Sequence, residues 1–413
     1  MGNIEKKKIN WAKIAFIIVT VAVYTVFIIK WSAKQYMNSD WGNLILEADD
    51  VIHGNFFRSG WTLTSISFLT TDLPYFMIGV LIAGVSRDAF AIGVGLMVLA
   101  LSGTAVLWML HGSSRKNLIL KTCVILSFAM LHPYWSVYAM KAHGGAFVYS
   151  MIVFNIHERC REKNSFDKAK AWIIILSALA FMGDALFCMM TTMPIIIWTG
   201  VKWLKKEFTH KDAVIWGLTA MGGIPLGIVI SKLYYAIGGC DINGFKMRSA
   251  VFTPMENLQS NFTGYFKALF MIGGGDYFGH KVMYYDTPAV LVNAAVIILF
   301  FILSIYHIVC FLIGKKYEYA SLMAGMGFLV LSAAYTMTGK NAAEGIMHVR
   351  YISVFLPAAA VVIFRNIDFF MSEKTERLYL IFLCCGLVSV AGRVYIRYRR
   401  AVWKAEMNVN TSI

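Results

Sequence analysis

Long apolar runs recur along the chain, and they constrain its fold more than any other feature of the sequence. Runs of about 17–25 apolar residues match the length that an α-helix needs to cross a hydrocarbon layer of about 30 Å. Within lipid every backbone amide needs a partner inside its own segment, so such runs form helices. The alternating segments of about ten residues that build a membrane β-barrel are not seen in this sequence. We therefore predict an all-α, polytopic transmembrane helical bundle of about 10–12 spans.

Composition and charge support a membrane location and argue against nucleic acid as a partner. Hydrophobic residues make up 58% of the 413 residues and charged residues only 15%, whereas a soluble domain has about 25% charged residues. The net charge of +15 comes from 38 Lys and Arg against 23 Asp and Glu. The basic residues cluster in short loops beside the apolar runs, as expected for cytoplasmic loops that contact anionic lipid. The seven cysteines form no CxxC pair and no Cys/His spacing typical of zinc.

The chain reads as one transmembrane domain, residues 1–413, with no separate soluble domain. Lys6, Lys7 and Lys8 before the first run predict a cytoplasmic N-terminus in the plasma membrane. The spans follow as Ile14–Ile29, Ala89–Leu110, Leu118–Trp135, Ala146–Ile156, Trp172–Trp198, Ala213–Ile237, Ala289–Ile313, Tyr319–Met337, Tyr351–Phe364 and Leu378–Val390. Of these, Trp172–Trp198 is read as two short helices with an outer tip. By this count the basic tail RVYIRYRRAVWK lies on the outer side of the membrane, against the usual charge rule. Either one weak span is miscounted or the tail lies on the membrane interface.

Two long segments are predicted on the outer side, at residues 34–73 and 239–287. In the first, Asp40–His53 places apolar residues at helical spacing, which predicts an amphipathic helix lying in the interface. The short run Pro74–Val85 that follows is read as a helix that dips partway into the membrane. The second outer segment, which includes MIGGGDYFGHK, is read as a loop.

The charged residues that could carry chemistry gather on the predicted outer face. Because ionisable groups at membrane depth are costly, a functional role is the default hypothesis for them. Carboxylates facing cations at the depth of lipid headgroups suit phosphate recognition together with proton transfer. The candidates are Asp40, Asp49, Asp50, Asp72, Lys141, His143, Asp184, His348 and Arg350, with Trp41 and Tyr351 as possible substrate contacts.

The arrangement of these residues resembles the GT-C glycosyltransferases, membrane enzymes that take sugars from polyprenyl-phosphate donors, such as protein O-mannosyltransferases and aminoarabinose transferases. In that superfamily an acidic residue just past the first span is catalytic or holds a metal, and Asp40 in MNSDWGN matches it. TDLPYF resembles the Pro-led entry to the next helix. MHVRYISVFLP resembles a late Arg-Tyr motif before a Pro-broken span, which implies a role for Arg350 and Tyr351.

The resemblance implies a glycosyltransferase that moves a sugar to a glycan, lipid or protein acceptor on the extracytoplasmic face. Asp40 would activate the acceptor hydroxyl, while Arg350, Lys141 and His348 would hold the donor phosphate. One departure is the second outer turn, where KAHGG replaces the acidic residue that many members carry. That puts a two-carboxylate metal site in doubt, so the cofactor stays unknown: a divalent metal is not excluded, and none is clearly encoded.

Other interpretations remain open at the level of sequence. Asp40 could cap the helix that begins at Trp41, Asp49 and Asp50 could form a solvated helix face, and Arg350 could be an interfacial anchor. The alternative functions are an O-antigen or capsule-type polysaccharide polymerase, which would depend on the 239–287 loop, and a lipid-linked-sugar flippase or transporter. A transporter predicts charged residues deep in mid-span and inverted halves.

Overall fold

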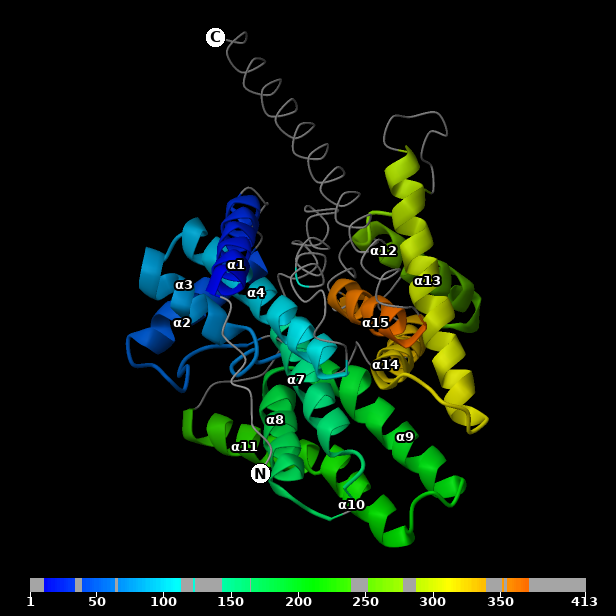
Figure 1. The fold of residues 1–413 in the computed structure, drawn as a ribbon. Helices are drawn as coiled ribbons and strands as arrows, with labels where there is room; N and C mark the ends of the chain where they lie inside the picture. The colour runs from blue at the N-terminus through cyan, green and yellow to red at the C-terminus, as the bar shows by residue number, and fades with distance from the viewer. Residues whose placement is uncertain are drawn as a thin grey trace, which may run out of the picture.

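The described part of the chain is entirely helical apart from turns, loops and an isolated bridge between Phe252 and Thr338 in the computed structural model. The described residues are 11–33, 39–63, 66–112, 122, 143–163, 165–238, 252–277, 287–338, 351–352 and 355–370. Their helices, drawn in Figure 1, are α1 (Trp11–Ser32), α2 (Ser39–Ile52), α3 (Leu73–Ala83), α4 (Arg87–Gly112), α7 (Gly144–Cys160), α8 (Lys168–Gly183), α9 (Met193–Leu204), α10 (His210–Met221), α11 (Gly223–Gly238), α12 (Leu258–Ile272), α13 (Thr287–Leu312), α14 (Tyr319–Met337) and α15 (Phe355–Phe370).

Several predicted elements are confirmed. The amphipathic segment forms α2, in which Asn43 is exposed, Asp49 and Asp50 are half-buried, and the apolar residues buried at helical spacing are Trp41, Leu44, Ile45, Ala48 and Val51. The run 172–198 is divided into α8 and α9, separated by a tip at 184–187 and a π-helical turn at Cys188–Thr192. The predicted spans Leu118–Trp135 and Leu378–Val390 lie outside the described residues, apart from Thr122.

Two segments differ from the sequence prediction. The segment 239–287, predicted as a loop, contains a helix, α12, whose moderately apolar sequence buries Tyr265 and Leu269. The predicted span Ala213–Ile237 forms the two helices α10 and α11, which meet at Gly222. Hydropathy cannot locate such a junction, because it averages over both helices.

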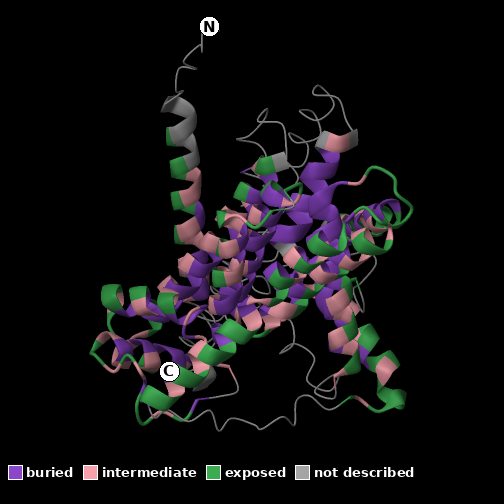
Figure 2. Ribbon diagram, turned by 90° about the horizontal axis from the view of Figure 1, so that it is seen from below, coloured by how far each residue is buried: buried purple, intermediate pink, exposed green. Residues whose placement is uncertain are grey.

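Within the described residues, four helical stretches are long and apolar enough to cross a membrane: Arg87–His111, His210–Gly238, Val290–Leu312 and Tyr319–Met337. Shorter apolar stretches occur in α1, α3 and α15. The outward faces of α1 and α13 carry exposed aliphatic side chains, among them Ile18, Val23 and Ile302. Figure 2 shows the buried residues gathered in the centre of the bundle. Apolar surface on this scale would be unfavourable in water but suits lipid, so the structure supports a polytopic membrane protein.

Helix α4 lies at the centre of the N-terminal half and packs against α1, α3, α7 and α15. Gly79 lets α3 approach α4 closely, since a Cβ there would lie 2.1 Å from the carbonyl oxygen of Ala89. Tyr24 of α1 shares a hydrogen bond of 3.1 Å with Ser102 of α4.

The helix directions define two ends of this bundle. Helices α4 and α7 run parallel, since Met97 lies against Gly144 near one end and Trp108 bonds to Glu158 near the other. We call the end at the start of α7 the Asp72 end, because Asp72 lies beside it, and the end near Glu158 the Glu158 end. A rise of 1.5 Å per residue separates His143 from Glu158 by roughly 22 Å along α7.

Candidate functional site

Asp72 is the carboxylate that joins three segments at the Asp72 end. It directly precedes α3, yet its side chain makes no capping bond to that helix. Its two oxygens instead accept hydrogen bonds from the backbone N–H groups of His143 and Gly145, each 2.7 Å long. These groups belong to the first turn of α7, where N–H donors lack partners in the helix and the helix dipole favours negative charge. Asp72 therefore fixes the start of α7 from a distant loop.

The loop that carries Asp72 is held between α7 and α8. Its Phe68 N–H donates to the carbonyl of Gly183 over 2.9 Å, and its Thr70 hydroxyl donates to the carbonyl of Leu179 over 2.5 Å. Gly145 makes this approach possible, because a Cβ there would lie 2.3 Å from the Thr71 carbonyl. The loop position thus depends on backbone contacts that no side-chain motif encodes.

His143 and Asp184 form a buried pair beside Asp72. Nδ1 of His143 lies 2.5 Å from Oδ2 of Asp184, and both side chains are only 2% exposed. The other oxygen of Asp184 accepts from the N–H of Leu186 over 2.9 Å, which fixes the carboxylate at the tip between α8 and α9. His143 has a φ of 67°, a left-handed conformation that is costly for a residue with a side chain. Strained backbone at a buried ionisable pair is a feature that functional sites share.

Two aromatic rings border the imidazole of His143. The ring of Phe68 lies 5.5 Å away and that of Tyr351 lies 4.9 Å away, measured between centroids. Among the described residues, no group hydrogen-bonds to Nε2 of His143, the ring nitrogen that Asp184 does not contact. The geometry therefore gives a buried histidine with one ring nitrogen held by a carboxylate, the pairing expected where an imidazole acts as an acid or base.

The electrostatics of this site are dominated by burial. Burial raises the pKa of Asp72 to about 7, the neighbouring His143 opposes that shift, and Asp184 adds to it. Asp184 contacts the imidazole of His143 directly, and Asp72 accepts from the backbone N–H of the same residue. Carboxylates grouped around a buried histidine are the arrangement expected for acid–base chemistry.

The structure brings together four of the residues that the sequence singled out, namely Asp72, His143, Asp184 and Tyr351. Asp40 lies in the first turn of α2, and its side chain is outside the described set. Lys141, His348 and Arg350 also lie outside the described residues.

The remaining candidates in α2 serve other contacts. Asp49 lies 3.3 Å from Nδ1 of His53, its neighbour one turn along the chain. Asp50 accepts hydrogen bonds from the indole of Trp61 at 2.7 Å and from Asn55 at 2.5 Å. Trp41 is 4% exposed and stacks on Phe90 of α4, so it packs in the core.

Arg58 is a buried residue whose role the sequence did not reveal. Its side chain is fully buried, donating to Glu47 over 2.9 Å, to the carbonyl and hydroxyl of Ser67, and to Tyr234 over 3.1 Å. It thereby ties α2 and α11 to the loop that carries Asp72. Basic residues at an interface usually snorkel toward water, so only the fold shows that this one turns inward.

A second buried ionic group lies at the Glu158 end. The guanidinium of Arg365 in α15 contacts the carboxylates of Glu158 and Glu318, the latter at 2.6–2.7 Å. The signal that could have found it is a pair of charges placed beside apolar runs, Glu158 after Ile156 and Arg365 after Phe364. The predicted span Ala146–Ile156 leaves Glu158 outside it, because the apolar run stops before α7 does.

Neither a metal site nor a relative defines the function. Among the described residues, no group of three or more His, Cys, Asp and Glu side chains could hold a metal ion. Comparison with known proteins finds no matching family model, no matching curated protein and no matching solved structure.

Proposed function

We propose that the chain is an integral-membrane glycosyltransferase of the GT-C type. It would transfer a sugar from a polyprenyl-phosphate donor to a glycan, lipid or protein acceptor on the extracytoplasmic face of the plasma membrane. The observation that carries this proposal is the buried His143–Asp184 pair at the Asp72 end. The N-terminus would be cytoplasmic, and the Asp72 end would face outside.

The chemistry needs a base and a stabiliser of negative charge. A new bond forms between the acceptor oxygen and the anomeric carbon of the sugar, while the bond from that carbon to the donor phosphate breaks. His143 would accept the hydroxyl proton on Nε2, and Asp184 would stabilise the resulting imidazolium through Nδ1. Asp40 remains the second candidate base, on the resemblance alone.

The donor phosphate leaves as an anion and needs positive charge. Arg350 directly precedes Tyr351, whose ring borders His143, and Lys141 lies two residues before His143 in the sequence. Their places in the chain favour them, together with His348, as the groups that hold the phosphate.

The position of the ionisable groups favours this function over transport. A transporter would gather them near the middle of the membrane. The described buried ionisable groups instead gather toward the two ends of α7, at His143 and at Glu158, roughly 22 Å apart. A polymerase would depend on the segment 239–287. The described part of that segment forms α12, and it contributes no residue to the group formed by Asp72, His143 and Asp184.

Donor turnover tests the proposal. Purified protein in nanodiscs is incubated with a panel of polyprenyl-phosphate sugars and candidate acceptors, and the release of free polyprenyl phosphate is measured. Consumption of one donor, abolished in Asp40→Asn or His143→Gln and kept in Asp49→Asn, supports the glycosyltransferase and identifies the base. Growth of an oligosaccharide on the lipid would point to a polymerase. Movement of a fluorescent lipid-linked sugar across liposomes without hydrolysis would point to a flippase.

A further inference from the structure

An aromatic cluster lies at the Glu158 end, opposite the candidate active site. It consists of His157, Trp198, Trp216 and Tyr319, from α7, α9, α10 and the start of α14, and all four side chains are buried. The His157 ring lies 4.9 Å from Trp198, 4.6 Å from Trp216 and 5.7 Å from Tyr319, measured between centroids. Helices α7, α9, α10 and α14 are therefore joined around one imidazole.

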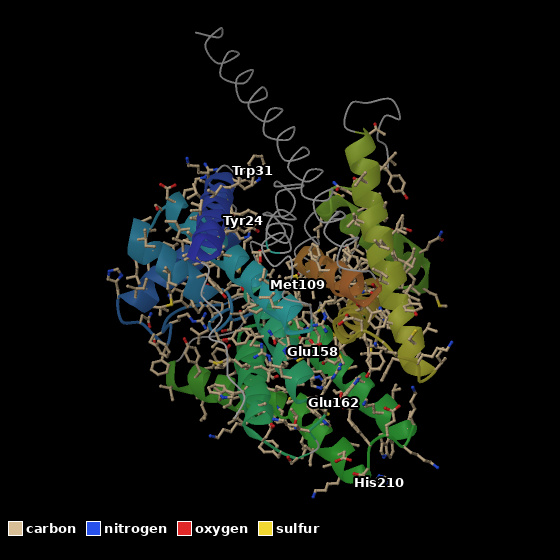
Figure 3. The ribbon with its side chains drawn as sticks, viewed as in Figure 1. Tyr24, Trp31, Met109, Glu158, Glu162 and His210 are labelled. Carbon is tan, nitrogen blue, oxygen red and sulfur yellow. The ribbon has the colours of Figure 1, made fainter. Side chains whose placement is uncertain are left out.

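Three cations surround this aromatic cluster. The distances from the charged group to a ring of the cluster are 4.6 Å for Arg161, 4.3 Å for Lys170 and 5.1 Å for Lys202. They come from the chain just after α7, from the first turn of α8 and from the last turn of α9. We call these three residues the cationic rim. Figure 3 shows the helix ends concerned, with Glu158 inside the bundle and Glu162 and His210 farther toward its edge.

Several nitrogen atoms in this region are buried without a partner. Among the described residues, no hydrogen bond is made by Nε2 of His157, Nε1 of Trp198, Nε1 of Trp216 or Nη1 of Arg161. Indole and guanidinium nitrogens are donors only, so three of the four atoms need an acceptor. Buried donors normally have partners, and a group of unpaired ones in a single cluster calls for an explanation.

Nearby carboxylates do not satisfy these donors. Glu162 lies 3.2 Å from Nε of Arg161, and Glu207 lies 3.5 Å from Lys202, but their side chains are 78% and 44% exposed. Asp167 is 3.9 Å from Lys170, which also donates to a backbone carbonyl. The pairs made by the exposed Glu162 and Glu207 are weak and screened by salt, and the Asp167–Lys170 pair is long at 3.9 Å. An acceptor that carries several oxygens and a negative charge fits the remaining donors best.

We propose that the cationic rim and the aromatic cluster form a binding site for a phosphate group. Phosphate oxygens accept several charge-assisted hydrogen bonds at once. The rim lies at helix ends, the depth at which basic pockets between spanning helices hold anionic lipid headgroups. The phosphate could belong to such a headgroup or to a small soluble anion, and both present the same chemistry to the rim. The site is independent of the proposed glycosyltransferase activity.

The test compares lipid and soluble phosphate on the full-length protein. Delipidated protein in neutral detergent is titrated with phosphatidylglycerol, with phosphatidylcholine, with glycerol 3-phosphate and with inorganic phosphate. Bound lipid is measured by native mass spectrometry, and the soluble anions are measured by calorimetry. Preference for phosphatidylglycerol over phosphatidylcholine with no effect of soluble anions identifies a headgroup site. Binding of glycerol 3-phosphate or inorganic phosphate identifies a site for soluble phosphate.

Variants separate the rim from general surface charge. Arg161→Gln and Lys202→Gln are expected to weaken binding about tenfold each, as for the loss of one charge-assisted hydrogen bond. Lys168→Gln is the matched control, because Lys168 is exposed on the same helix as Lys170. Trp198→Phe keeps an aromatic ring, although a smaller one, and removes the indole N–H donor; it should weaken binding while the protein still elutes as a single folded species. Equal effects of Lys168→Gln and Arg161→Gln, or binding of neither probe, would overturn the proposal.

Discussion

Replacing Arg365 by Met should destabilise the protein strongly, and the structure predicts which second substitution restores stability. Arg365 is 5% exposed, and it is the counter-ion of Glu158 and Glu318, which are 8% and 6% exposed. Removing one member of a buried ionic group leaves uncompensated charge and costs about 3–5 kcal/mol. We expect a loss of that size in the free energy of unfolding.

The two carboxylates differ in what remains after the arginine is lost. Glu318 still accepts from the N–H groups of Ala320 and Ser321 and from the Ser321 hydroxyl, at 2.7–3.1 Å. Among the described residues, the hydrogen bond that Glu158 keeps comes from the indole N–H of Trp108, at 3.0 Å. Most of the cost therefore falls on Glu158, and adding Glu158→Gln to Arg365→Met should recover about 1–3 kcal/mol, within the range of couplings between contacting residues. Adding Glu318→Gln should recover less.

The assay is reversible unfolding in mixed micelles of dodecyl maltoside and sodium dodecyl sulfate, followed by tryptophan fluorescence. The proteins of two double-mutant cycles, one that pairs Arg365→Met with Glu158→Gln and one that pairs it with Glu318→Gln, are compared with Lys168→Gln, an exposed charge change on α8 that should shift stability little. A loss below about 1 kcal/mol for Arg365→Met would refute the view that this arginine neutralises buried charge. Better rescue by Glu318→Gln than by Glu158→Gln would refute the assignment of the cost.

Three further predictions concern the Asp72 end. Gly145→Ala should cost about 1–3 kcal/mol, measured by thermal unfolding, because the added Cβ would lie 2.3 Å from the Thr71 carbonyl; Gly103→Ala, with no atom within 4 Å, should not destabilise. Arg58→Met should cost about 3–5 kcal/mol in the same assay, because it leaves the largely buried carboxylate of Glu47 without its partner. Folding raises the pKa of Asp72 from 3.8 to about 7. Between these values the folded protein keeps a proton on Asp72 that the unfolded chain releases, so the free energy of unfolding should fall as pH rises from about 4 to 7. The difference from Asp72→Asn should reach about 4 kcal/mol across that window, and a flat difference would contradict the burial of a protonated carboxyl.

Much of the helical layout could be predicted from the sequence because lipid imposes simple rules on it. Run length and hydropathy locate α4, α13 and α14, and the spacing of apolar residues locates α2. The division of the run 172–198 could be predicted because Asp184 and Pro194 interrupt its apolar residues. The junction between α10 and α11 and the helix α12 could not be predicted, because neither changes the local hydropathy enough.

The candidate site was predictable in its members but not in its arrangement. Asp72, His143 and Asp184 each stood out as a charge beside an apolar run. Nothing in the sequence indicated that the Asp72 carboxylate binds the first turn of α7, or that His143 pairs with Asp184, 41 residues away. These contacts depend on close backbone approach at Gly145 and Gly183, which is a tertiary property.

Single-turnover release of polyprenyl phosphate by wild type and Asp184→Asn is the most direct test of the central claim. The asparagine keeps the size of the side chain but cannot stabilise an imidazolium at His143, so the rate should fall about 10²–10⁴-fold with the protein still folded. Asp49→Asn is the matched control and should react at the wild-type rate. A folded Asp184→Asn variant that releases polyprenyl phosphate as fast as wild type would contradict the assignment of His143 and Asp184 to the reaction.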